Sequence, residues 1–144
     1  MSKKTKIALI EDDQTISQMY RIKFETCGGY DVQLAENGVD GIKLVQKFNP
    51  DIILLDLRMP TMDGDECLAE IRKHNWGKDI PVLILTNIGI EEAPAILKTL
   101  NVANYVVKAE ATPKQVVALV ETTISAHKNK NGTTTTTIST EITA

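Results

Sequence analysis

The sequence predicts one α/β domain of the doubly wound type, a three-layer (βα)5 sandwich around a five-stranded parallel sheet of order 2-1-3-4-5. Short apolar runs alternate with helical apolar stripes five times along the chain, as strand–helix units joined by right-handed crossovers require. The runs at residues 7–10, 52–55 and 82–85 are continuously apolar, which is typical of parallel strands covered on both faces. Residues 30–34 alternate apolar with polar instead, and the order 2-1-3-4-5 places this second strand at an edge.

The other elements follow from the spacing of the apolar residues. Residues 105–107 form a short fifth strand. After each strand, apolar residues recur at the three- and four-residue spacing of a helix that buries one face. The five stripes, in chain order, are Ile16, Tyr20, Phe24 and Cys27; Val39, Ile42 and Val45; Cys67, Leu68 and Ile71; Ala93, Ile96, Leu97 and Leu100; and Val116, Val120 and Ile124.

Capping residues agree with these helices. Asp63 is followed three residues later by a glutamate, and Thr112 by a glutamine, which is the spacing of a capping box. Pro113 then falls at the first helical position, where its missing N–H group leaves no hydrogen bond unmade. Gly28 and Gly29 close the first helix.

The length of 144 residues corresponds to one domain on the usual range of about 100–200 residues. We place this domain at residues 1–127. Residues 128–144 read KNKNGTTTTTISTEITA and contain too few apolar side chains to offset the entropy of ordering them. We therefore expect residues 128–144 to be a disordered, threonine-rich tail.

Composition excludes several classes of protein. The chain has 19 acidic and 16 basic residues, a net charge of −3, which argues against a basic nucleic-acid-binding face. Its apolar runs are too short to cross a membrane, and the first is too short for a secretory signal. We expect a cytoplasmic protein with no membrane partner. Cys27 and Cys67 lack metal-ligand spacing and are expected to be buried, reduced thiols.

Chemically active side chains follow four of the five predicted strands. Because the carboxyl ends of parallel strands meet at one edge of a sheet, these side chains can converge there. The acidic run 11–13 follows the first strand and includes Asp12 and Asp13, Asp56 follows the third, Thr86 the fourth and Lys108 the fifth. Each residue alone is ordinary, since an acid after a strand is usually a helix cap or a solvated turn. The combination is what indicates a site.

Each of these residue types has a role in phosphoryl transfer. Asp12, Asp13 and Asp56 would repel one another, and a hard divalent cation such as Mg²⁺ (or Mn²⁺) relieves that repulsion. Asp56 is the candidate nucleophile, because a carboxylate can form an aspartyl-phosphate. Lys108 would supply positive charge, and the Thr86 hydroxyl can donate to a phosphoryl oxygen.

Other doubly wound proteins fit less well. A flavin carrier needs a hydroxyl- and glycine-rich loop after the first strand, where this chain has acids that repel phosphate. A phosphatase with an aspartate nucleophile would have a second acid two residues later, but position 58 is Arg58.

The chain resembles the receiver domain of two-component response regulators, of the single-domain, chemotaxis-regulator type with a flavodoxin-like fold. The resemblance spans roughly residues 6–126, and its most specific part is Asp56–Gly64, DLRMPTMDG, which is similar to the family segment D-x-x-M-P-x-M-D-G. By this resemblance Asp56 is the phosphoacceptor, Asp12 and Asp13 bind the metal, and the Arg58 backbone carbonyl is a further metal ligand. Thr86 and Lys108 match the conserved hydroxyl and lysine, and Tyr105 the aromatic that changes rotamer on activation.

The resemblance also implies partners. A histidine kinase or a histidine phosphotransfer protein would supply the phosphoryl group. A downstream protein would bind the face made by the fourth helix, fifth strand and fifth helix. The chain would then be a signalling phosphoacceptor rather than an enzyme. The alternative is a pseudo-receiver that binds proteins without phosphorylation, although such a chain would be expected to lack Asp56, Asp13 or Lys108.

Two positions depart from the family pattern. The family usually has Lys-Pro with a cis peptide bond where this chain has Lys108–Ala109. A cis bond before a residue other than proline costs about 2.5–4 kcal/mol, so we expect a trans bond or a strained cis one, and an altered loop. Ile88 stands where small residues are common, and we expect Arg58 and Ile88 to flank the phosphoryl group and hinder the water that hydrolyses it.

Overall fold

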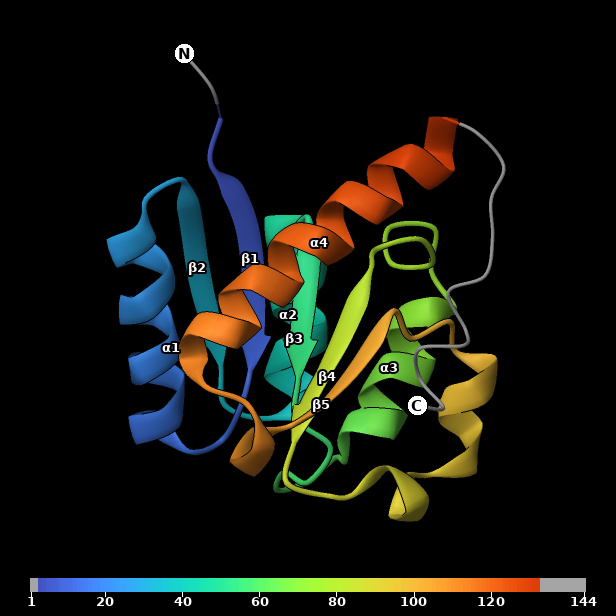
Figure 1. Ribbon diagram of the computed structural model, residues 1–144. Helices are drawn as coiled ribbons and strands as arrows, with labels where there is room; N and C mark the ends of the chain where they lie inside the picture. Colours follow the sequence, from blue (N-terminus) through green and yellow to red (C-terminus); the bar gives the residue numbers. More distant parts are fainter. Residues whose placement is uncertain (1–2, 133–144) are drawn as a thin grey trace.

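The computed structural model describes residues 3–132, which form a single three-layer α/β sandwich (Figure 1). All five strands are parallel and lie in the order β2-β1-β3-β4-β5, so both the predicted fold class and the strand order are confirmed. The strands are β1 (Thr5–Ile10), β2 (Tyr30–Ala35), β3 (Ile52–Leu55), β4 (Val82–Thr86) and β5 (Asn104–Val107).

Four α-helices cover the sheet, α1 and α4 on one face and α2 and α3 on the other (Figure 1). They are α1 (Gln14–Cys27), α2 (Gly38–Phe48), α3 (Gly64–Arg72) and α4 (Pro113–Gly132). The predicted caps are present: Gly28, in the left-handed region, caps α1, and Asp63 forms a capping box with Glu66. At the start of α4, Thr112 exchanges hydrogen bonds with Gln115.

The sheet separates two hydrophobic cores. Successive residues of β1 point to opposite faces: Ile7 and Leu9 pack with α1 and α4, whereas Ala8 and Ile10 pack with α2 and α3. All eight side chains of residues 7–10 and 52–55 are at most 1% exposed. Burial on both faces explains why these strands are continuously apolar. Cys67 lies in the second core, but Cys27 is exposed at the end of α1, so the expectation of a buried thiol was wrong there.

The predicted helix between the fourth and fifth strands is not an α-helix. Its place is taken by two short 3-10 helices, η1 (Ile90–Glu92) and η2 (Ala95–Thr99). Ala93 and Pro94 between them are extended, with ψ of 143° and 132°. Proline disfavours the α conformation of the residue before it and has no N–H group to donate. Leu97 still packs into the core, but Ile96 from the same predicted stripe is 45% exposed.

The C-terminal helix runs past the expected domain boundary. Helix α4 continues from residue 127 to Gly132, so the first residues of the expected tail are helical, and residues 133–144 lie outside the described part. Within residues 3–132 no peptide bond is cis, so the Lys108–Ala109 bond is trans, and residues Lys108–Glu110 form one 3-10 turn, η3. No helix in this part of the chain is long and apolar enough to span a membrane.

Candidate functional site

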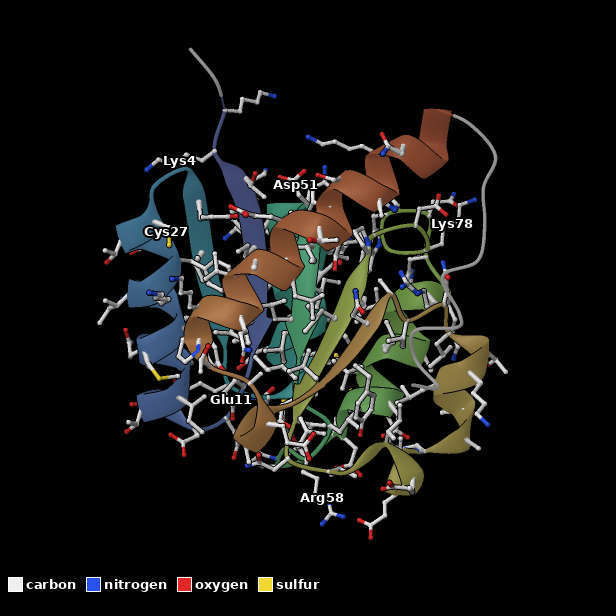
Figure 2. The ribbon with its side chains drawn as sticks, in the orientation of Figure 1. Lys4, Glu11, Cys27, Asp51, Arg58 and Lys78 are labelled. Carbon is white, nitrogen blue, oxygen red and sulfur yellow. The ribbon has the colours of Figure 1, made fainter. Side chains whose placement is uncertain are left out.

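The register of the sheet brings four strand ends to one edge. Ile10 pairs with Leu55, and Leu55 pairs with Ile84, so residues 11 and 56 and the end of β4 lie next to one another. The end of β5 is aligned with the end of β4 in the same way. Figure 2 shows Glu11 and Arg58 at this end of the molecule, at the bottom of the view.

Three carboxylates gather at this edge. An oxygen atom from each of Glu11, Asp12 and Asp56 lies within 4.8 Å of the others. Glu11 is 2% and Asp56 7% exposed, whereas Asp12 is at the surface. Three oxygen ligands at this spacing, two of them removed from water, are a donor set that a hard divalent cation fits.

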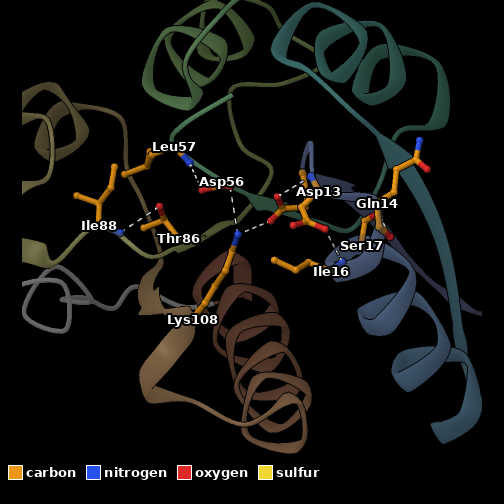
Figure 3. A network of polar contacts seen from close by, with 10 residues as sticks. Asp13, Gln14, Ile16, Ser17, Asp56, Leu57, Thr86, Ile88 and Lys108 are labelled. Atoms are coloured by element: carbon orange, nitrogen blue, oxygen red, sulfur yellow. Dashed lines mark hydrogen bonds and ion pairs between the residues drawn. The ribbon is translucent and has the colours of Figure 1, made fainter. Parts of the chain in front are cut away.

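Lys108 joins two of these carboxylates (Figure 3). Its ammonium group donates to Oε1 of Glu11 and, at 3.2 Å, to Oδ2 of Asp56. The other oxygen of Asp56, Oδ1, accepts the backbone N–H of Leu57 at 2.7 Å. Burial disfavours the charged form of Lys108, but the hydrogen bond to Glu11 and the charge of Asp56 outweigh it and raise the Lys108 pKa. The lysine is therefore the cation of this site at neutral pH.

Glu11 takes the place that the sequence assigned to Asp13. The second carboxylate oxygen of Glu11 accepts the Asp13 backbone N–H at 3.0 Å, so both Glu11 oxygens are engaged. Burial raises the pKa of Glu11, against the lowering effect of Lys108. The Asp13 side chain instead caps α1 by accepting the N–H of Ile16 at 3.1 Å. Asp13 as a metal ligand is thus not supported by this geometry; its position just before α1, where aspartate is a favoured cap, was the available signal.

Thr86 and Tyr105 both form hydrogen bonds to the backbone of Ile88. Thr86 is 1% exposed, and its hydroxyl accepts the backbone N–H of Ile88 at 3.4 Å. The Tyr105 hydroxyl donates to the Ile88 carbonyl oxygen at 2.7 Å. Burial raises the Tyr105 pKa, and the charge of Asp56 adds to this effect, so the phenol stays protonated. Both backbone groups of Ile88 are therefore held by the two residues expected to switch.

Arg58 lies at the surface beside the acidic cluster. A cavity of about 380 Å³ adjoins the site and is lined by Leu57, Arg58, Asp63, Asp65, Ile88, Glu92 and Pro94. Arg58 and Ile88 thus border one cavity together with Leu57, the residue after the phosphoacceptor candidate. That they flank the phosphoryl group and hinder the hydrolytic water stays a prediction. The Arg58 carbonyl as a metal ligand stays a prediction.

Comparison with known proteins identifies the family. A model of the response regulator receiver domain matches residues 7–121. The DNA-binding dual master transcriptional regulator RpaA of Synechocystis sp. is 42% identical over 84 residues, covering 58% of this chain and 34% of that protein. Protein-glutamate methylesterase/protein-glutamine glutaminase 3 of Rhodospirillum rubrum is 30% identical over 117 residues, covering 81% and 31%. The chain spans about a third of the length of these curated relatives.

Solved structures with the same fold are similar over most of this chain. The chemotaxis response regulator CheY4 of Vibrio cholerae superposes with a TM-score of 0.77 at 26% identity, covering 84% of this chain and 99% of CheY4. A CheY-like receiver domain protein from Methanospirillum hungatei gives a TM-score of 0.81 at 18% identity, covering 89% and 99%, and supports the fold alone.

Proposed function

This chain belongs to the response regulator receiver domain family, and we propose that it is a phosphoacceptor in a two-component phosphorelay, with Asp56 as the residue that takes the phosphoryl group. The observation that carries the proposal is the environment of Asp56. Its carboxylate is almost buried at the end of β3, and it is bonded to the Lys108 ammonium group and the Leu57 N–H. A carboxylate held in this way is oriented before any substrate arrives.

The acidic cluster suits the Mg²⁺ that receiver domains bind in an acidic pocket. Glu11, Asp12 and Asp56 would hold the ion, with the Arg58 carbonyl as a further ligand. Bound there, Mg²⁺ would neutralise the charge that develops on the transferring phosphoryl group. Among the three carboxylates, Asp12 is the most exposed and Glu11 is already engaged with Lys108.

The reaction would be a displacement at phosphorus. A phosphohistidine on a histidine kinase or phosphotransfer protein is the donor. A carboxylate oxygen of Asp56 forms a bond to phosphorus while the bond from phosphorus to the histidine nitrogen breaks, and the nitrogen keeps that electron pair. Lys108, which already contacts the Asp56 carboxylate, would stabilise the negative charge of the phosphorylated product.

Phosphorylation would affect the rest of the domain through the hydrogen bonds to the Ile88 backbone. When the Thr86 hydroxyl turns to the new phosphoryl group, the Ile88 N–H loses its acceptor, and a rotation of Tyr105 releases the Ile88 carbonyl. Both changes act on the start of the segment that carries η1 and η2. The face proposed to bind a downstream protein therefore consists of these two 3-10 helices, β5 and α4, rather than of two regular helices and a strand.

The output would be a contact with another protein in the cytoplasm. One relative is described as DNA-binding, but this chain matches only about a third of its length. We therefore assign no nucleic-acid contact to residues 3–132.

Phosphorylation by a small donor tests the proposal. The full chain is incubated with acetyl phosphate and Mg²⁺, and its intact mass is measured. We expect one added phosphoryl group that is absent without Mg²⁺ and absent in Asp56→Asn. Asp79→Asn, an exposed carboxylate at the opposite edge of the sheet, is the matched control and should be phosphorylated normally. A wild-type chain that gains no phosphoryl group from any donor would favour the pseudo-receiver alternative.

A further inference from the structure

Thr61 has an unusual backbone conformation. Its φ is 64°, in the left-handed region, where a β-branched side chain crowds the backbone. Within residues 3–132, the other non-glycine residues with positive φ are Asn49 and Asn101, and asparagine tolerates this conformation. A residue that disfavours the conformation is therefore held in it by its surroundings.

The conformation belongs to a three-residue turn. The Pro60 carbonyl accepts the Met62 N–H at 2.7 Å and also the hydroxyl of Thr61. A hydrogen bond from residue i+2 back to residue i, around a centre with positive φ, defines a tight γ-turn, a strained form. The proline ring fixes the backbone just before the turn, which limits the ways in which it can relax.

The loop that contains this turn begins and ends on the phosphoacceptor segment. Gly64 N–H donates to the Leu57 carbonyl at 2.8 Å, and a Cβ on Gly64 would lie 2.1 Å from the Asp56 carbonyl oxygen. The chain therefore leaves Leu57 and must return to it within the next seven residues. Thr61 lies in this loop, with a left-handed backbone that turns the chain sharply.

Other contacts fix the loop on both sides of the turn. Met59 is 8% exposed and packs in the core with α2 and α3. The Met62 side chain lies 2.9 Å from the point where a Cβ on Gly38 of α2 would stand. Asp63 is tied into α3, where its N–H donates to Glu66 at 3.1 Å. The turn cannot move without disturbing one of these contacts.

We infer that Thr61 is a positioning residue for the acidic site: its strained turn holds the Leu57 N–H on Oδ1 of Asp56, and so fixes the orientation of the phosphoacceptor carboxylate. With Oδ1 held by Leu57, Oδ2 faces Lys108. Only the effect of this orientation on Mg²⁺ binding rests on the proposed function, whereas the effect on the Leu57 N–H does not.

Three substitutions separate strain from positioning. Thr61→Gly removes the strain but frees the turn, because glycine adopts many conformations. Thr61→Asn also lowers the strain but keeps a side chain that favours the left-handed region. Asn101→Gly makes the same kind of change at the opposite edge of the sheet and is the matched control. Native-state amide hydrogen exchange of Leu57 and Gly64, thermal unfolding and Mg²⁺ titration are measured for each full-length variant.

For Thr61→Gly we expect the Leu57 and Gly64 amides to exchange about tenfold faster, with no fall in Tm. Mg²⁺ should bind about threefold more weakly. Thr61→Asn should show the amide exchange rates and the Mg²⁺ affinity of the wild type. Asn101→Gly should leave the exchange of the Leu57 and Gly64 amides unchanged. Leu57 and Gly64 amides that stay as protected in Thr61→Gly as in the wild type would overturn the inference. If the wild type binds no Mg²⁺ but Thr61→Gly still exposes these amides, the inference stands and the proposed metal use fails.

Discussion

Replacing Lys108 by methionine removes the positive charge that lies between Glu11 and Asp56. The side-chain volume is nearly kept, so the change tests charge rather than packing. Carboxylate oxygens of Glu11 and Asp56 lie within 4.8 Å of one another, and both side chains are less than 10% exposed. With an effective dielectric constant of about 20, two unit charges at this distance repel by about 3.5 kcal/mol.

The protein can avoid this repulsion by protonating Glu11, at a similar cost. Burial already raises the Glu11 pKa, and the loss of Lys108 raises it further. At pH 7, about 2.5 pH units above its ordinary pKa of 4.5, protonating Glu11 costs about 3.4 kcal/mol, at about 1.36 kcal/mol for each unit. Either route predicts that Lys108→Met lowers the free energy of unfolding by about 3 kcal/mol at pH 7 without Mg²⁺.

The pH dependence has a definite sign. A carboxyl whose pKa is raised in the folded state stabilises the fold below its unfolded pKa, and this contribution is lost as the pH rises through the folded value. Lys108→Met should therefore approach wild-type stability near pH 5 and fall behind it toward pH 7. Urea unfolding from pH 5 to pH 8 measures the difference. Mg²⁺ at about 100 times its Kd should add about 2.7 kcal/mol to the free energy of unfolding of Lys108→Met.

Two further variants make the result specific. Lys114→Met removes an exposed lysine at the start of α4 and should change stability by less than about 0.5 kcal/mol. In Lys108→Met with Asp56→Asn, one of the two repelling charges is gone, so the double variant should be more stable than Lys108→Met alone. The electrostatic reasoning is refuted if Lys108→Met unfolds like the wild type at pH 7 without Mg²⁺.

Four other substitutions have distinct expected outcomes. Asp12→Asn should weaken Mg²⁺ binding tenfold or more, on the order of 1.4 kcal/mol, with little change in Tm. Asp13→Ala should instead cost about 1 kcal/mol of stability as a lost cap and leave Mg²⁺ affinity unchanged. Calorimetric titration and urea unfolding measure the two effects, and finding them reversed would contradict both predictions. Gly64→Ala should destabilise by about 3 kcal/mol or more, because its Cβ would meet the Asp56 carbonyl at 2.1 Å, and an unchanged urea midpoint would contradict this. Ile88→Ala should shorten the lifetime of the aspartyl-phosphate several-fold, because a smaller side chain in the cavity next to Leu57 would hinder the hydrolytic water less. Intact mass followed over time measures this lifetime, and an unchanged lifetime counts against the steric role.

The sheet could be predicted from the sequence because the burial of a strand determines which residue types it can contain. Strands covered on both faces have no room for polar side chains, so residues 7–10 and 52–55 are apolar throughout. The edge strand β2 keeps polar residues at Asp31 and Gln33, of which Gln33 is exposed. Once five strand–helix units are assigned, the parallel direction and the common edge of the functional side chains follow from topology alone.

The segment between β4 and β5 could not be predicted from its apolar spacing. The stripe of Ala93, Ile96, Leu97 and Leu100 has helical periodicity, but a helix also needs a backbone that can start it. Pro94 holds Ala93 in an extended conformation, and the left-handed Asn101 ends the segment soon afterwards. The segment between these two points is short, and 3-10 turns occupy it.

The acidic run after β1 shows why a site can be located from sequence before its residues can be assigned. Glu11, Asp12 and Asp13 are alike in charge, and any two of them could have been the pair that faces Asp56. The structure divides them because β1 ends at Ile10 and α1 begins at Gln14, so the turn between them has only three residues. The first acid continues the strand and reaches Lys108, the last must cap the helix, and the middle one is left at the surface of the cluster. The length of this turn, more than the chemistry of the side chains, therefore determines which carboxylates are available to a metal ion.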